Sequence, residues 1–194
     1  MLGLLASLAA FPAVAAPGNL PPEQQAATSD QPDQPTGLNF KYLRLSGDTF
    51  HSLDSRTVYK WTDPGCYYVT SAVGIPRFAH KVELPHGAVV RFMRLYFYDD
   101  SISTLRAFFT IYDAQGNSSA LVNVGSETTG GFSSTLAPEF HYEVDNQNTA
   151  IDVVVNLNPG ADTALALRFC GVRIAYDAPI ADRIFANGFD SPPL

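Results

Sequence analysis

Adjacent carboxylates are the first residues in this chain whose type suggests chemistry. Asp99 and Asp100 follow the aromatic run Leu95–Tyr98, and Asp145-Asn146 forms a second oxygen-rich turn. Extracellular β-sandwiches bind calcium through hard oxygen ligands gathered from loops of this kind. Asp and Asn also favour turns because their side chains bond to their own backbone. The sequence therefore offers Asp99 and Asp100 as candidate calcium ligands, with ordinary turn chemistry as the alternative, and predicts no other cofactor.

Catalytic signatures are absent from the sequence. It contains no GxSxG elbow, HExxH, phosphate-binding loop or GxGxxG. The four histidines lack the i, i+2 or i, i+4 spacing that would bring two onto one metal. His80 falls on an apolar strand face, which predicts a hydrogen-bonded core residue, whereas His141 lies on a polar face. We expect a non-enzyme, and a hydrolase using carboxylates or His141 is the third alternative.

Two cysteines, Cys66 and Cys170, are the whole thiol content of the chain. An even count in an exported protein predicts a disulfide. The bond would close a loop of about 100 residues, which the chain-entropy model values at roughly 4–5 kcal/mol. The alternative is a pair of unrelated buried thiols. A metal site is disfavoured because neither cysteine has a second ligand at CxxC or CxxH spacing.

Aromatic and arginine side chains alternate with core positions along two successive segments. We group them as one candidate binding or oligomer face: Arg94, Tyr96, Tyr98, Arg106, Phe108 and Tyr112. Tyr, Phe and Arg are enriched at contact hot spots, which predicts a homo-oligomer interface. The same aromatics would also suit a sugar-binding platform. A third interpretation is that the second sheet covers this face, with inside and outside reversed.

A second candidate sugar platform lies near the first cysteine. It consists of Trp61, Tyr67 and Tyr68. Its aromatic rings would stack on pyranose rings in the same way as those of the first candidate face.

The elements that must position these residues are short strands. Leu105, Ala107, Phe109 and Ile111 alternate with polar or aromatic neighbours, and the segment 151–157 repeats this period of two. No window has sustained helical periodicity. The pattern predicts an all-β fold, an antiparallel two-sheet sandwich, of jelly-roll type with 9–10 strands.

The last predicted strand, 164–176, changes its apolar parity. Leu167 and Phe169 occupy odd positions, whereas Val172 and Ile174 occupy even ones. One extra residue at Gly171 would restore the alternation, so we predict a β-bulge there, where the strand bends from one sheet towards the other.

The flanks of the domain have a different composition. Residues 1–15 form an apolar stretch with a small-x-small end, which predicts a signal peptide whose basic n-region is missing; the alternative is a buried helix. The proline-rich segment 16–37 is expected to be a disordered linker, 38–178 the β-sandwich and 179–194 a tail. We therefore expect export through the periplasm to the medium or cell surface, with no membrane span after processing.

The formal charge of −7 disfavours nucleic acid as a partner, because a polyanionic backbone selects clustered Lys and Arg.

Three short motifs resemble a group of secreted bacterial β-sandwich proteins. They are 82–90 (VELPHGAVV), 95–100 (LYFYDD) and 170–176 (CGVRIAY), which match the LPxGA, YYYD and GVRIxY patterns of that group. The resemblance spans about residues 60–178 and includes the turn at 144–146; it implies a structural scaffold and no catalytic residues. Residues 184–190 (IFANGFD) resemble the IFxxGFE ending of exported Xanthomonas-type gammaproteobacterial proteins, with Asp190 in place of Glu.

Together these observations predict an exported, non-catalytic β-sandwich for extracellular interaction or structure, which assembles with itself. The alternative is a carbohydrate-binding domain, assisted by calcium, with a glycan or cell-surface partner.

Overall fold

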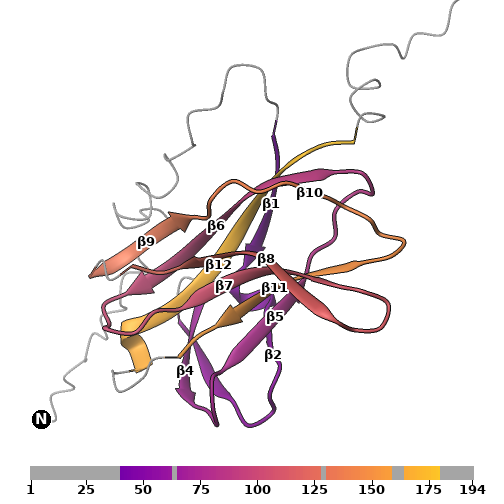
Figure 1. Cartoon of the computed structure of the whole chain (residues 1–194). Helices are drawn as coiled ribbons and strands as arrows, with labels where there is room; N and C mark the ends of the chain where they lie inside the picture. The colour runs from indigo at the N-terminus through magenta and orange to yellow at the C-terminus, as the bar shows by residue number, and fades with distance from the viewer. Residues whose placement is uncertain (1–39, 63–64, 128–129, 159–163, 180–194) are drawn as a thin grey trace, which may run out of the picture.

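Two antiparallel β-sheets face each other in the computed structural model (Figure 1). The structure describes residues 40–62, 65–127, 130–158 and 164–179. The predicted signal peptide, linker and all but the first residue of the predicted tail lie outside these residues. Sheet A contains β1 (Lys41–Ser46), β3 (Val58–Thr62), β4 (Cys66–Ser71), β6 (Val89–Asp99), β9 (Gly131–Leu136), β10 (Tyr142–Glu143) and β12 (Leu167–Asp177). Sheet B contains β2 (His51–Ser52), β5 (Arg77–Lys81), β7 (Arg106–Tyr112), β8 (Ser118–Gly125) and β11 (Ala150–Asn156).

The strand order is that of a jelly roll, as predicted. Sheet A runs β3-β4-β12-β6. β9 and β10 pair with the free side of β6, and β1 pairs with the same side of β12 as β4. Sheet B runs β2-β5-β11-β7-β8. The chain crosses between sheets after β1, β2, β4, β5, β6, β8, β10 and β11, and only β7 and β8 form a hairpin among the strands from β4 to β9. The described residues contain more strands than the 9–10 predicted. The additional ones are β2 and β10, which are only two residues long and leave no alternation to detect in the sequence. Two short 3₁₀ turns complete the elements, η1 (Gly47–Thr49) and η2 (Ala164–Ala166).

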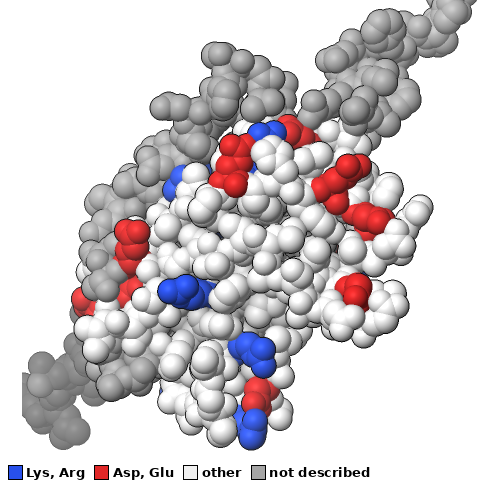
Figure 2. All heavy atoms as spheres, in the orientation of Figure 1, with Lys and Arg blue, Asp and Glu red and all other residues white. Residues whose placement is uncertain are grey.

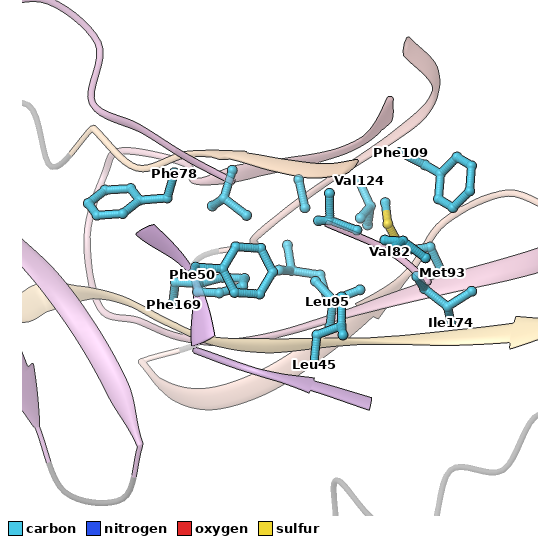
Figure 3. Packing of buried hydrophobic residues seen from close by; sticks show 14 of the residues in the cluster. Leu45, Phe50, Phe78, Val82, Met93, Leu95, Phe109, Val124, Phe169 and Ile174 are labelled. Carbon is cyan, nitrogen blue, oxygen red and sulfur yellow. The ribbon is translucent and has the colours of Figure 1, made fainter. Parts of the chain in front are cut away.

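The core lies between the sheets and is formed by the predicted alternation. Phe78 and Phe109 of sheet B lie in one core cluster with Phe169 and Leu95 of sheet A (Figure 3), and all four side chains are buried. His80 is half-buried at the margin of the sandwich, so the prediction of a core residue is wrong, but its Nδ1 lies 2.9 Å from the Thr49 carbonyl oxygen, which confirms the predicted hydrogen bond.

The predicted bulge is present in β12. The pairing of β12 with β6 shifts register between Phe169 and Gly171, so Cys170 is the extra residue. The apolar positions thereby face the core on both sides of the shift. The strand does not bend into the second sheet, because β12 pairs with β6 along nearly its whole length.

Glycine is required at the bulge for two reasons. Gly171 has φ +138°, and a Cβ placed on it would lie 2.4 Å from the Leu45 carbonyl oxygen. β1 therefore approaches β12 at a distance that only a residue without a side chain permits.

The predicted disulfide joins Cys66 at the start of β4 to Cys170 in the bulge. The two strands are neighbours in sheet A, paired at Tyr67 and Phe169. The bond thus ties two segments separated by 104 residues. None of the helical segments among the described residues has the length and apolar character needed to cross a bilayer.

Candidate functional site

The candidate face predicted along 94–112 is divided between the two sheets. Arg94, Tyr96 and Tyr98 lie on β6 in sheet A, whereas Arg106, Phe108 and Tyr112 lie on β7 in sheet B. Each set is on the outer side of its own sheet, so the two sets face away from each other. The prediction of one continuous face is wrong because the chain crosses the sandwich between β6 and β7. The interpretation that the second sheet covers this face is also wrong, since both sets lie on the sides of their sheets that face away from the core.

The sheet B set borders a groove of about 220 Å³. Phe108 and Tyr112 are half-buried and stand on the same side of β7, with Thr110 between them. The groove is lined by Arg77, Phe108, Thr110, Tyr112, Ser118, Ala120, Val154 and Asn156. Arg106 is exposed and does not line it. We call this hollow the sheet B groove.

Strand register explains why the surface is hollow here. Ala120 of β8 is paired with Thr110, and Val154 of β11 is paired with Phe108. These small or branched side chains leave a low floor beside the larger aromatic rings. In the next row, Asn156 of β11 lies between Arg106 and Arg77, which closes one end of the groove with polar groups.

The polar groups of the groove are held for hydrogen bonding. Burial and the nearby Asp152 carboxylate raise the pKa of the Tyr112 hydroxyl, and the Arg77 guanidinium partly offsets them. Tyr112 therefore stays protonated at neutral pH and is able to donate. The Asn156 Oδ1 atom is buried and accepts no hydrogen bond from any described residue. An unpaired buried acceptor of this kind is uncommon in folded proteins. A hydroxyl group is one donor that would satisfy it.

Charge is sparse over the centre of the face drawn in Figure 2, across which Figure 1 places β7, β8 and β11. Acidic side chains gather towards the border of that face, and a few separated basic side chains lie inside it.

Two larger hollows, each of about 450 Å³, lie elsewhere. One is lined by 81–84, 146 and 149–151, and the other by 86, 143–145, 147 and 148. Neither lining contains Phe, Tyr or Trp. The sheet B groove is the smallest of the three and the one that combines aromatic rings with hydrogen-bonding side chains.

The second predicted platform does not assemble. Tyr67 is fully buried and packs on Phe78 at a ring distance of 4.5 Å, so it belongs to the core. Trp61 packs against Tyr67 at the edge of sheet A and is 47% exposed, while Tyr68 points to the opposite side of β4. Adjacent strand residues alternate sides, which is why Tyr67 and Tyr68 cannot present rings together.

The candidate calcium ligands do not converge. Asp99 is fully buried, and its carboxylate accepts hydrogen bonds from the Ser101 amide and hydroxyl and from the Ser126 hydroxyl. Asp100 is exposed on the other side of the chain. In the described part of the chain no three His, Cys, Asp or Glu side chains are grouped to hold a metal ion. The structure thus assigns Asp99 to a buried serine network and corrects the calcium prediction.

Arg77 and Asn156 are groove residues that sequence reasoning missed. The signal available for Asn156 was its place on the polar side of 151–157, opposite the core positions. Nothing in the sequence placed this strand beside 106–112, since the two segments are separated by a hairpin and two sheet crossings.

Comparison with known proteins shows weak structural likeness. No protein-family model matches the sequence, and no curated protein does. A Clostridium thermocellum xylanase 10B structure, comprising CBM22-1 and GH10 modules complexed with xylohexaose, is 11% identical with a TM-score of 0.48; the match covers 73% of this chain and 28% of that one. A family 35 carbohydrate-binding module from Clostridium thermocellum is 10% identical with a TM-score of 0.43, covering 69% of this chain and 97% of the module. CBM29_1 from Piromyces equi is 12% identical with a TM-score of 0.40, covering 77% and 99%. At these values the likenesses assign no function.

Proposed function

We propose that this chain is a non-catalytic carbohydrate-binding domain whose glycan lies in the sheet B groove. The observation that supports the proposal is the presence of two aromatic rings, Phe108 and Tyr112, beside hydrogen-bonding side chains in one groove. Binding sites for small ligands are concave and largely apolar, with a few placed polar groups. A sugar ring offers an apolar C–H face to an aromatic ring and hydroxyls at its rim, so the groove matches its chemistry.

The groove favours a neutral glycan. Its one cationic lining side chain, Arg77, and the Asp152 carboxylate act on the pKa of Tyr112 with opposite sign. The groove thus has charges of both signs near it, so a net charge on the ligand would gain little. Its volume is below the range of about 300–1,000 Å³ that suits drug-sized ligands, which fits contact with one sugar ring at a time.

Export is the second component of the proposal. A disulfide is typical of oxidising compartments, and the Cys66–Cys170 bond agrees with the apolar stretch predicted to be a signal peptide. A domain that binds glycan outside the cell would meet its ligand in the medium or at a surface.

Affinity electrophoresis through gels containing xylan, mannan, β-glucan or dextran tests the proposal. We expect at least one neutral polymer to retard the full chain, and Phe108→Ala to weaken retardation by about tenfold, since a stacked aromatic contributes about 1–1.5 kcal/mol. Phe132→Ala on β9, an equal truncation in sheet A, is the control. The proposal fails if no neutral polymer retards the protein, or if the two variants behave alike.

Self-assembly through an aromatic face stays a prediction. The β6 set and the β7 set of this predicted face lie on opposite sides of the molecule, so each would have to form an interface by itself. Light scattering behind a sizing column measures it directly: a discrete dimer or trimer supports it and a monomer contradicts it.

A further inference from the structure

The outer side of sheet A has a row of arginines on three adjacent strands. Arg44 of β1 is paired with Arg173 of β12, and Arg173 is paired with Arg94 of β6. Three guanidinium-bearing residues therefore stand directly opposite one another on three adjacent strands, about 4.8 Å apart from strand to strand. A fourth arginine, Arg168, lies further along β12 opposite Tyr98. We call these four residues and the tyrosines stacked on them the arginine face.

Like charges placed directly opposite across strands destabilise a sheet. Acidic partners would relieve this cost, and the chain has 19 acidic residues against 12 basic ones. Within the described residues, however, none of the four arginines has a carboxylate within 4 Å, whereas Arg56 and Arg91 do. The positive charge of the arginine face is thus locally uncompensated in an acidic protein.

Tyrosines hold the guanidinium groups in place without neutralising them. Arg44 lies over Tyr96 at 4.9 Å, and Arg173 lies over Tyr42 at 5.0 Å. Arg168 lies over Tyr98 at 4.1 Å. Stacking engages the flat side of a guanidinium and leaves its N–H edge available for a bidentate anion. Arg168 already donates Nε–H to the Leu165 carbonyl oxygen at 2.7 Å, so its Nη groups are the donors that remain.

Arg94 adds an independent observation. Its side chain is on the outer side of the sheet yet only 8% exposed. Nη1 donates to Ser134 Oγ at 3.0 Å, and Nε has no partner among the described residues. Burying a cation without a counter-ion is costly, and no carboxylate of the described residues pairs with Arg94, so a bound anion would relieve this cost.

We propose that the arginine face binds an acidic polysaccharide, whose anionic groups lie on the arginine row and whose sugar rings lie over the exposed edge at Tyr42. Tyr42 and Arg44 are exposed and provide the entry to the row. A nucleic acid is disfavoured relative to an acidic polysaccharide, because duplex DNA has a denser charge, one per about 1.7 Å, and the net charge of −7 therefore repels it more strongly. This site lies on the sheet opposite the groove, so it goes beyond the proposed function and either site is able to fail alone.

Gel retardation of the full chain by four polymers tests this proposal: polygalacturonate, its fully methyl-esterified form, dextran sulfate and duplex DNA. We expect polygalacturonate to retard the protein in a salt-sensitive way and the neutral ester not to. Retardation by dextran sulfate as well would show that sulfates also occupy the site. Failure of both acidic polysaccharides, or equal retardation by DNA, would overturn the proposal.

Variants localise the binding. Arg44→Gln and Arg173→Gln are each expected to weaken retardation by about tenfold, the loss of a charge-assisted contact. Arg56→Gln removes the same charge from an exposed arginine outside the face and is expected to leave retardation unchanged. Arg44 is exposed, so its variant keeps the test valid even where Arg173→Gln lowers stability. Equal effects of Arg44→Gln and Arg56→Gln would contradict the assignment.

Discussion

At the residue scale, Asp99 stabilises the fold although it follows a surface-like aromatic run. Its two carboxylate oxygens accept from Ser101 and Ser126, and the Ser126 hydroxyl oxygen also accepts from the Leu105 amide. Removing the carboxylate leaves these buried groups unsatisfied, so Asp99→Ala should lower the free energy of unfolding by about 2–4 kcal/mol. Urea denaturation measures the loss. The neighbouring Asp100→Ala, at an exposed position, should cost less than about 0.5 kcal/mol, and equal losses would contradict this role.

Gly171 makes a second prediction at the same scale. An alanine there would have to keep a positive φ, and its methyl would clash with the Leu45 carbonyl oxygen. Gly171→Ala should therefore lower the free energy of unfolding by about 3 kcal/mol or more. Gly116→Ala is the control, because Gly116 also has positive φ (+82°) but nothing within 4 Å of the added Cβ. It should cost only about 1 kcal/mol. Thermal unfolding compares the two, and a control that is the more destabilised would count against the close approach of β1 to β12.

At the element scale, the disulfide supports the junction of β4 and β12. The chain-entropy model predicts that Cys66→Ser with Cys170→Ser lowers the free energy of unfolding by about 4–5 kcal/mol. Denaturation of the intact protein with and without reductant provides the same comparison without mutation. An unchanged midpoint after reduction would show that the bond adds nothing to the fold.

Acid should weaken the turn at 145–149 once the Asp145 carboxyl is protonated. Asp145 accepts hydrogen bonds from the Asn148 side chain and the Gln147 amide, which lower its pKa. A carboxyl whose pKa is lowered on folding contributes stability that is present above its unfolded pKa, about 4, and is lost as pH falls through the folded value. Carbon NMR of the Asp145 carboxyl should therefore show a titration below the ordinary aspartate value of 3.8. A titration above that value would contradict these bonds.

At the scale of the whole molecule, the sequence predicts which side of each strand faces the core, but it does not predict which strands are neighbours in a sheet. The alternation at 105–111 identified inner and outer sides of β7, and the parity change at 171 identified the bulge. The division of 94–112 between two sheets depends on long-range pairing of β6 with β12 and of β7 with β11. Such pairing is set by the packing of the whole core, so the groove residues Arg77 and Asn156 could not be assembled from local pattern.

Amide shifts measured by NMR as soluble neutral xylo-, manno-, gluco- and isomalto-oligosaccharides are added test the central claim most directly. The binding sugar is expected to perturb residues 106–112, 118–120 and 154–156 around the sheet B groove, while 92–98 in sheet A stay unchanged. Perturbations confined to sheet A, or none with any of the four sugars, would contradict glycan binding in the groove.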